Sequence, residues 1–520
     1  MRTTNHVVCS SPRWMELVVL KMAPVQVLWQ FRLKNKTRKS ICMNFRVLLK
    51  ALKLIVLTIL VTSCSTNSKV ANTNPEVGDP NDYDTPRQQV DKNNGQLPLS
   101  KRIVWWQDAK FGMFIHWNVS SVPAGKYHGE LMPKTNLGGK ARYAEHIMYK
   151  CKIPVAEYKD FGKQFNPTDY NPDAWVDLAK EVGMKYIVFT AKHHDGFAMY
   201  DTKFSDWSIV KSSPYGNDIV RSLSDACHRK GMKFGVYYSQ AQDWVNKGGF
   251  PYCKEVGGWD SIHNGNYDQY LKAVAVPQLH ELLTNYGEIS ELWFDTPKEM
   301  TPARAAYFAP LYALQPKMVI NNRLGGGEQG DFSTPEQKIP TQGFGTGKYW
   351  ESCMTINYAW GYCESDQEWK STKTLIKNLC ECVSKGGNFL LNIGPDAQGN
   401  IPAPALERLK GIGAWMKMNG EAIYGTKSSY SSSALDYGFS THRVLPNGNI
   451  RIYVMVFDWP TDGKFKLTGF IGQPLACRML GSKVTFSATS STDGITVSGL
   501  PAVAPNEFAS VIELDLKFKK

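Results

Sequence analysis

The sequence lacks the short motifs that mark several large classes of enzyme. No CxxC pair occurs among its 11 cysteines, which disfavours zinc ribbons and thioredoxin-like redox chemistry. It has no GxSxG elbow, no HExxH motif and no glycine-rich phosphate loop after a strand. These absences argue against serine hydrolases, zinc peptidases and nucleotide-binding folds. Function must therefore be inferred from composition and from the order of predicted strands and helices.

The chain also carries little net charge outside its first 63 residues. The formal charge is +13, but residues 1–63 hold 11 Lys and Arg against one acidic residue, Glu16, which leaves +3 for residues 64–520. Nucleic-acid-binding domains usually present a basic surface, so we expect no nucleic-acid partner. A hydrophobic content of 42% and an aromatic content of 12% are ample for a buried core. The chain is predicted to be globular.

Residues 1–63 are predicted to be an over-extended N-terminus plus a signal peptide. Basic residues precede the apolar run 54–61 (LIVLTILV), which is too short to span a bilayer comfortably and is followed by small residues and Cys64. This order resembles a bacterial lipoprotein signal, with Cys64 as the lipidated N-terminus and Met43 as the expected start. An ordinary secretory signal is the alternative. Because no acidic run follows Cys64, we expect the periplasmic side of the outer membrane, with the cell surface as the alternative.

The rest of the chain is predicted to hold a linker and two domains. Residues 64–98 are polar and aperiodic, which is typical of a linker. Over residues 99–425, short apolar runs alternate with amphipathic helical stretches, which favours a (β/α)8-type, TIM-like barrel. Residues 426–520 contain β-type runs without a helical pattern, which predicts a C-terminal β-sandwich, either structural or carbohydrate-binding. The strands expected in the barrel are 111–117, 185–190, 233–239, 291–296, 318–323, 349–355 and 388–394.

Polar side chains stand at the ends of these strands, where a barrel places its functional groups. They include His116, His193-His194, Tyr237 and Asp295. Aromatic rings stack on the apolar face of a sugar, while His, Arg and carboxylate groups bind its hydroxyls, so the pattern indicates a carbohydrate ligand. Metal binding by His193 and His194 is the rival interpretation, but sequence neighbours rarely point at one ion. We therefore expect neither a metal nor a cofactor.

Sugar hydrolysis needs two carboxyl groups that flank the glycosidic bond. Asp295 is the candidate nucleophile because it ends an apolar strand behind Trp293, where limited water and the nearby Arg323 would keep it ionised. Two residues compete for the acid/base role. Glu336 lies in a loop and can approach from outside, whereas Glu351 lies in a strand-like run and can instead orient a ligand or neighbour. We favour Glu336 and keep Glu351 as the alternative.

Five motifs in this region strongly resemble those of the α-L-fucosidases of glycoside hydrolase family 29. They occur in order as 111–117 (FGMFIHW), 192–197 (KHHDGF), 235–239 (GVYYS), 292–295 (LWFD) and 388–395 (NFLLNIGP). The resemblance implies a barrel followed by a β-sandwich. It also implies hydrolysis of terminal α-L-fucose from glycans or glycoconjugates, with retention and through Asp295 as nucleophile. The substrate contacts that it implies are His116, Glu145, His146, His193, His194, Tyr237, Trp293 and Arg323.

Two positions depart from the family pattern. His146 follows Glu145 where many members have a Glu-Trp pair, so an imidazole replaces an aromatic contact, and Asn322 stands where an aspartate is common before the arginine. Two other functions stay open: a catalytically inactive fucose-binding lipoprotein, and a hydrolase of a similar sugar such as a galactoside. The presence of both carboxyl candidates argues against the binding protein, because binding needs no nucleophile.

Overall fold

The computed structural model describes residues 94–134, 139–345 and 347–517, together with three short strands near the N-terminus. The chain divides into two compact units, residues 1–76 and 77–520. In the first unit, β1 (Glu16–Leu20), β2 (Leu28–Arg32) and β3 (Ser40–Ile41) form an antiparallel sheet in that order. The apolar run 54–61, Cys64 and the predicted linker up to residue 93 lie outside the described residues. Among the described residues, no helix combines the length and hydropathy needed to cross a membrane.

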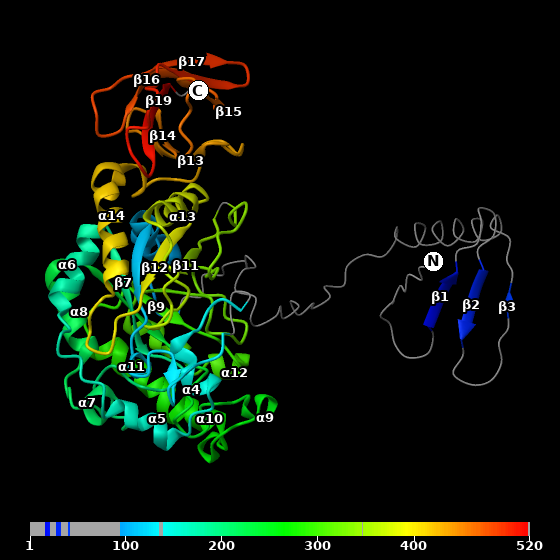
Figure 1. Ribbon diagram of the computed structural model, residues 1–520, viewed down its shortest axis with the longest axis vertical. Coiled ribbons are helices and arrows are strands. Elements are labelled where there is room, and N and C mark those ends of the chain that lie inside the picture. Colours follow the sequence, from blue (N-terminus) through cyan, green and yellow to red (C-terminus); the bar gives the residue numbers. More distant parts are fainter. Residues whose placement is uncertain are drawn as a thin grey trace. The chain divides into compact units, whose positions relative to one another are not determined.

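A parallel sheet of seven strands forms the centre of the second unit (Figure 1). All seven predicted strands are present, and nearly all of their residues are buried, as expected for a sheet covered on both faces. In spatial order the strands are β10 (Val319–Ile320), β9 (Glu291–Phe294), β8 (Lys233–Tyr238), β7 (Tyr186–Lys192), β4 (Phe111–Ile115), β12 (Asn388–Ile393) and β11 (Glu351–Thr355).

An irregular segment, rather than an eighth regular strand, closes this sheet into the expected TIM-like barrel. Segment 332–336 lies between the two edge strands. Phe332 pairs in parallel with Asn321 just after β10. On the other side, Ser333 pairs with Trp350 just before β11, and Glu336 pairs with Cys353 within β11. Pro335 within the segment has no N–H group, so it cannot donate to a ladder on either side. The barrel is therefore complete, but its closing strand is reduced to isolated bridges.

Helices cover the outer face of the barrel (Figure 1). The long ones are α6 (Pro172–Val182), α8 (Ile219–Lys230), α11 (Val276–Asn285), α13 (Thr372–Ser384) and α14 (Ala403–Asn419). One of the helical stretches on which the barrel prediction rests, 270–286, is instead divided into three pieces: α10 (Tyr267–Tyr270), the π-helical turn η4 (Leu271–Ala275) and α11. Pro277 explains the wider turn, because it has no N–H to donate to the carbonyl of Ala273.

Shorter elements fill the connections around the barrel. They are α2 (Leu99–Arg102), α3 (Val104–Ala109), η1 (Val119–Ser121), β5 (Lys126–Tyr127), β6 (Glu130–Leu131), η2 (Ala144–His146), α4 (Ile147–Lys150), α5 (Val155–Gly162), α7 (Ile209–Ser212), α9 (Cys253–Val256), η3 (Ser261–His263), α12 (Pro302–Ala305), η5 (Ala309–Leu314) and η6 (Gly420–Ala422). Two of them, η2 and α4, lie in the long connection after β4 and bring Glu145 and His146 towards the barrel.

Two antiparallel sheets follow the barrel. One contains β13 (Gly438–Val444), β14 (Ile450–Val456), β19 (Ser510–Lys517) and β16 (Gln473–Met479), and the other β15 (Lys464–Thr468), β18 (Gly494–Ser498) and β17 (Ser487–Ser491). One of the β-type runs on which the β-sandwich prediction rests, 483–487, was placed too early, because β17 begins only at Ser487. The indole N–H of Trp415 on α14 donates to the carbonyl of Ala509 at 2.9 Å, which joins this domain to the barrel.

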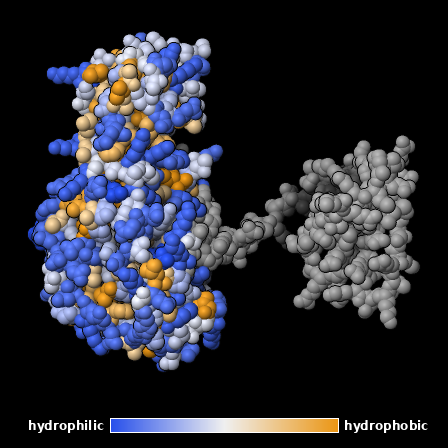
Figure 2. Space-filling model, viewed as in Figure 1, coloured by the Kyte–Doolittle hydropathy of each residue, from blue (hydrophilic) through white to orange (hydrophobic). Residues whose placement is uncertain are grey.

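The surface of the second unit that faces the viewer in Figure 2 is mainly hydrophilic, with apolar side chains in small separate groups. Such scattered groups are ordinary for a globular protein. The polar sites that carry function must therefore be sought in the barrel itself.

Candidate active site

A cavity of about 160 Å³ opens at the carboxyl ends of the barrel strands. This volume is well below the 300–1,000 Å³ typical of pockets for drug-sized molecules, so it suits one sugar ring. Its walls combine aromatic rings, imidazoles and carboxyl groups. The lining residues are Phe114, His116, Tyr143, Glu145, His146, His193, His194, Tyr237, Trp293, Asp295, Thr296, Arg323, Glu336 and Trp360.

Asp295, directly after β9, is held by three hydrogen-bond donors. Its Oδ1 accepts from Arg323 Nη1 at 2.8 Å and from the Thr296 amide at 2.9 Å. Its Oδ2 accepts from the Tyr237 hydroxyl at 2.8 Å. Burial alone would raise the pKa of Asp295, but Arg323 and Tyr237 outweigh it and hold the pKa below its ordinary value. The carboxyl group is therefore ionised at neutral pH.

Arg323 joins the two candidate catalytic carboxyl groups. Its Nη1 donates to Asp295 Oδ1 at 2.8 Å and to Glu336 Oε2 at 2.9 Å, so these two oxygens are less than about 6 Å apart. Thr334 fixes the guanidinium, accepting from Nε through its hydroxyl at 2.8 Å and from Nη2 through its carbonyl at 2.9 Å. About one third of the Glu336 side chain is exposed. Glu336 can therefore meet a group that enters from solvent.

His116 presents one acceptor nitrogen to the cavity. Its Nδ1 lies 2.7 Å from Asn392 Oδ1, while Asn392 Nδ2 donates to the carbonyl of Trp360 at 2.7 Å. Because an amide oxygen only accepts, His116 Nδ1 carries the hydrogen and Nε2 carries the lone pair. Burial lowers the pKa of His116 to about 4, so the ring is neutral.

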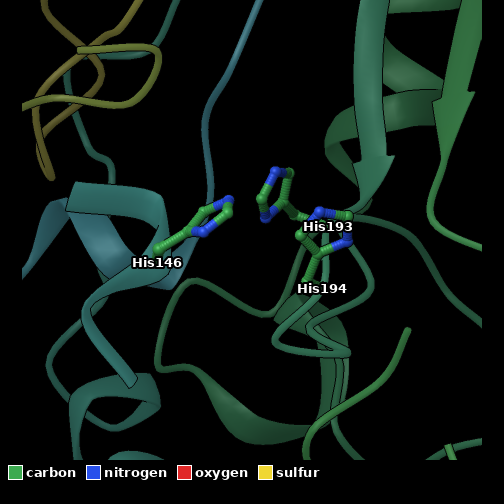
Figure 3. A group of neighbouring side chains, drawn as sticks. All are labelled: His146, His193 and His194. Carbon is green, nitrogen blue, oxygen red and sulfur yellow. The ribbon is translucent and has the colours of Figure 1, made fainter. Parts of the chain in front are cut away.

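Three further imidazoles gather on one side of the cavity. His193 and His194 follow β7, and His146, at the end of η2, points towards them from across the cavity (Figure 3). One nitrogen of each ring lies within 4.8 Å of the others. Burial lowers the pKa of His146 to about 4 and those of His193 and His194 well below the ordinary range. The three rings are neutral and can accept hydrogen bonds.

Glu145 supplies a carboxyl group of a different kind. Its Oε2 accepts from the Gly361 amide at 2.8 Å, and its Oε1 is buried without a hydrogen-bond partner among the described residues. Burial raises the pKa of Glu145 to about 8, because the charged form loses its hydration. At neutral pH it is mainly a protonated acid, which can donate to one oxygen of a ligand and accept from another.

Two comparisons place this arrangement among known proteins. A profile described as α-L-fucosidase matches residues 81–421. The chain belongs to the α-L-fucosidase family. The human plasma α-L-fucosidase is 33% identical to this family member over 403 residues, covering 73% of this chain and 79% of its own length. An α-L-fucosidase of Dictyostelium discoideum is 30% identical over 439 residues, covering 78% and 90%.

Solved α-L-fucosidase structures share the fold of this family member. Isoenzyme 1 from Paenibacillus thiaminolyticus superposes with a TM-score of 0.70 at 33% identity, covering 81% of this chain and all of the other. A family 29 α-L-fucosidase from Bacteroides thetaiotaomicron superposes with a TM-score of 0.71 at 27% identity, covering 83% and 99%. The latter structure is a trapped covalent intermediate, obtained with 2-fluoro-fucosyl fluoride and a glutamate-to-glutamine variant. The barrel with a C-terminal β-sandwich predicted from the sequence is thus confirmed.

The structure brings ten of the sequence-predicted site residues into one cavity. Five different barrel strands and two connections contribute them, as the rule of strand ends anticipated. The ten are His116, Glu145, His146, His193, His194, Tyr237, Trp293, Asp295, Arg323 and Glu336. Their individual roles towards a substrate stay predictions.

Glu351, the eleventh, does not line this cavity. It is fully buried on β11, where its carboxyl group accepts from the Tyr186 hydroxyl and, at 3.3 Å, from the Trp293 indole. Burial beside Glu291 raises the pKa of Glu351 to about 7 and that of Glu291 well above its ordinary value. The position matches the sequence-based alternative in which Glu351 orients a neighbour, here the Trp293 side chain of the cavity wall.

Sequence reasoning missed Phe114, Tyr143, Thr296 and Trp360, which complete the lining. Thr296 directly follows Asp295 and has a φ of +42°, unusual for a β-branched residue, which aims its amide at the carboxylate. Trp360 lies five residues after β11, beyond the reach of a rule based on strand ends. Phe114 could have been found, because it lies two residues before His116 and so faces the same side of the strand.

Proposed function

We propose that the chain is an exo-acting, retaining α-L-fucosidase that releases terminal fucose from oligosaccharides or glycoconjugates. The observation that carries this proposal is the pair of carboxyl groups on Arg323, whose nearest oxygens are less than about 6 Å apart. Retaining glycosidases place these groups about 5–5.5 Å apart, whereas inverting enzymes need about 6.5–9.5 Å to admit a water. Family membership supplies the sugar, and the small cavity favours a single terminal residue.

Hydrolysis proceeds by two displacements at the anomeric carbon. In the first, an Asp295 oxygen bonds to this carbon while protonated Glu336 gives its hydrogen to the departing glycosidic oxygen. In the second, Glu336 takes a proton from water, the water oxygen bonds to the anomeric carbon, and Asp295 leaves. Two inversions at the same carbon return the α configuration. Arg323 contacts both carboxyl groups, so it can interact with the reacting group in each of the two steps.

The other cavity residues are proposed to orient the sugar. The lone pair of His116 Nε2 and the neutral rings of His193 and His194 accept hydrogen bonds from hydroxyl groups. The free oxygen of Glu145 does the same, and its proton can be donated in return. Trp293, which lines the cavity and is held by stacking on Tyr237 and by Arg323, offers aromatic surface to the sugar.

Trapping and rescue test the nucleophile. We expect 2-fluoro-fucosyl fluoride to inactivate the purified chain and to label the peptide that contains Asp295, as detected by mass spectrometry. Asp295→Ala should abolish release of nitrophenol from an aryl α-L-fucoside, and added azide should restore turnover with β-fucosyl azide as product. Asp206→Ala, at a side chain that is 99% exposed, is the matched control. Near-normal activity of Asp295→Ala would overturn the assignment.

Leaving-group dependence tests the acid/base residue. Glu336→Ala should slow hydrolysis of natural fucosides, whose leaving groups need protonation, by about 10²–10⁴-fold. Activated aryl fucosides should lose much less. An aryl galactoside measured alongside tests the sugar. Faster galactoside than fucoside hydrolysis would refute the proposed specificity, and binding of fucose without any turnover would favour the binding-protein alternative.

We further propose that the chain is exported and anchored through a lipid on Cys64, at the periplasmic side of the outer membrane. The support is the order of basic residues, short apolar run and cysteine in the sequence. Labelling with radioactive palmitate in a bacterial host should mark the wild-type chain and not Cys64→Ser. Incorporation that survives this substitution would refute the anchor site.

A further inference from the structure

We propose that His146, His193 and His194 form a binding site for one divalent transition-metal ion, such as Zn²⁺, Co²⁺ or Cu²⁺. We also propose that this ion and the sugar exclude one another from the cavity, a part that rests on the proposed function. The three residues come from two separate connections of the barrel, after β4 and after β7, and meet only in the folded chain. The argument rests on the spacing of their nitrogens, their hydrogen bonds and their surroundings.

The spacing is close to what an ion needs. One nitrogen of each ring lies within 4.8 Å of the others (Figure 3). A tetrahedral ion with metal–nitrogen bonds of about 2.0–2.1 Å requires nitrogens about 3.4 Å apart. Each ring must therefore move inwards by less than about 1 Å, which rotation about its side-chain bonds can supply. Although His193 and His194 are neighbours in sequence, both rings face the same cavity, and their centroids are 4.3 Å apart.

His194 is already held as a metal ligand would be. Its Nδ1 lies 2.6 Å from Ser239 Oγ, and that hydroxyl donates its own hydrogen to the carbonyl of Gln242 at 2.9 Å. The hydroxyl must therefore accept from Nδ1–H, which leaves the lone pair on Nε2. Metal-binding histidines generally make such a second contact through the other nitrogen, which fixes the ring and its tautomer.

The lone pair of His194 faces a carboxylate, an arrangement that a cation would relieve. His194 Nε2 lies 3.5 Å from Asp295 Oδ2. Because the hydrogen-bond pattern places the hydrogen on Nδ1, the Nε2 lone pair and a carboxylate oxygen oppose each other, and an ion beside Nε2 would attract both. Arg323 on the Asp295 carboxylate, Lys192 near His194 and Lys150 near His146 oppose the added charge.

His193 and His146 have ring nitrogens that are available to an ion. His193 Nδ1 is buried and has no hydrogen-bond partner among the described residues, a state that usually costs stability unless a ligand or ion satisfies the atom. His146 is partly exposed at the cavity wall, so an ion can enter from solvent.

An ion at this point occupies the place of the sugar. The cavity has a volume of only about 160 Å³, and the same three rings line it together with Asp295. An ion would take the histidine lone pairs that the sugar hydroxyls need and would attract the carboxylate of the proposed nucleophile. Metal and fucose should therefore compete, and the metal should inhibit hydrolysis.

Titration of the full chain with Co²⁺ tests the site without relying on activity. We expect one equivalent to bind and to give the intense visible absorption of a four- or five-coordinate nitrogen site. His146→Gln should weaken binding at least about tenfold, and Ser239→Ala, which frees the His194 ring, by about 10–100-fold. His280→Gln, at an exposed histidine of α11, is the matched control and should bind like the parent.

The outcomes separate the parts of the proposal. No Co²⁺ binding at millimolar concentration, or equal binding by the parent, His146→Gln and Ser239→Ala, would overturn the site. A thiolate charge-transfer band would place the ion on a cysteine and overturn it as well. If Co²⁺ binds and L-fucose does not weaken the binding, mutual exclusion is wrong. If the chain binds Co²⁺ but does not hydrolyse fucosides when it is assayed free of metal, the proposed function is refuted and the metal site stands.

Discussion

Glu351 and Glu291 form a buried acid pair directly behind the Trp293 wall of the cavity, and the substitution Glu351→Gln tests what this pair does. The introduced amide would keep an oxygen to accept from the Tyr186 hydroxyl or the Trp293 indole, and its N–H groups can donate to Glu291. The substitution therefore resembles permanent protonation of Glu351 with little change of shape. We expect the fold and the cavity to persist.

The expected effect on stability depends on pH, and its sign follows from the pKa. Burial raises the pKa of Glu351 from 4.5 to about 7 in the folded chain. Between these values the folded chain holds a proton that the unfolded chain has released, so the free energy of unfolding falls as pH rises. Each pKa unit corresponds to about 1.4 kcal/mol, which gives a loss of roughly 3 kcal/mol for the parent. Glu351→Gln cannot lose this proton and should escape that loss.

Urea-induced unfolding at pH 5 and pH 8 measures this difference. The free energy of unfolding of Glu351→Gln, relative to that of the parent, should rise by roughly 3 kcal/mol from pH 5 to pH 8. The control Glu407→Gln, at a side chain 80% exposed, should show no such change. Activity should stay within about tenfold of the parent for every leaving group. A stability difference that is independent of pH would refute the buried proton. A loss confined to poor leaving groups would return the acid/base role to Glu351.

Three further substitutions probe the supports of the site. Asn392→Ala leaves His116 Nδ1–H and a carbonyl unpaired, and should cost about 1–3 kcal/mol for each group in urea unfolding; no loss would show that water replaces the amide. Lys192→Met removes the ion-pair partner of buried Asp243 and should lower the free energy of unfolding by about 3–5 kcal/mol. Lys203→Met, at an exposed lysine, should lower it less. Arg323→Gln should move the acidic limb of the kcat/KM profile upwards by about one to three pH units, because the arginine holds the pKa of the nucleophile down; an unchanged limb would contradict that role.

The sequence was sufficient to predict the barrel because its strands are buried on both faces. Such strands are short, almost wholly apolar runs that stop at polar residues, so β9 and β12 stand out from the flanking helices. In the C-terminal domain the pattern is weaker. β16 and β17 alternate poorly and leave most of their residues exposed or half-exposed, so they carried no signal and their positions were missed or shifted. The closing segment 332–336 was likewise invisible as a strand.

The candidate site was predictable wherever a functional group directly ends a strand. Asp295 and His193 stand in that position, whereas Tyr143 and Trp360 reach the cavity from within long connections whose paths no periodicity describes. The choice between Glu336 and Glu351 also needed the fold. Both are glutamates near polar and aromatic residues in sequence, and only the inward or outward direction of each segment separates them.

The closing segment 332–336 also has a consequence for how the protein can diversify. Asp295 follows one barrel strand, and Glu336 stands on the segment that seals the barrel, bridged to β11 through Cys353. The gap between the two carboxyl groups is thus set by the spacing of neighbouring strands in the barrel wall. Residues 337–349, which begin just after Glu336 and lead to β11, do not determine the gap between the two carboxyl groups. Evolution can lengthen or shorten this stretch, and so change which glycans gain entry, without altering the stereochemical outcome of the reaction.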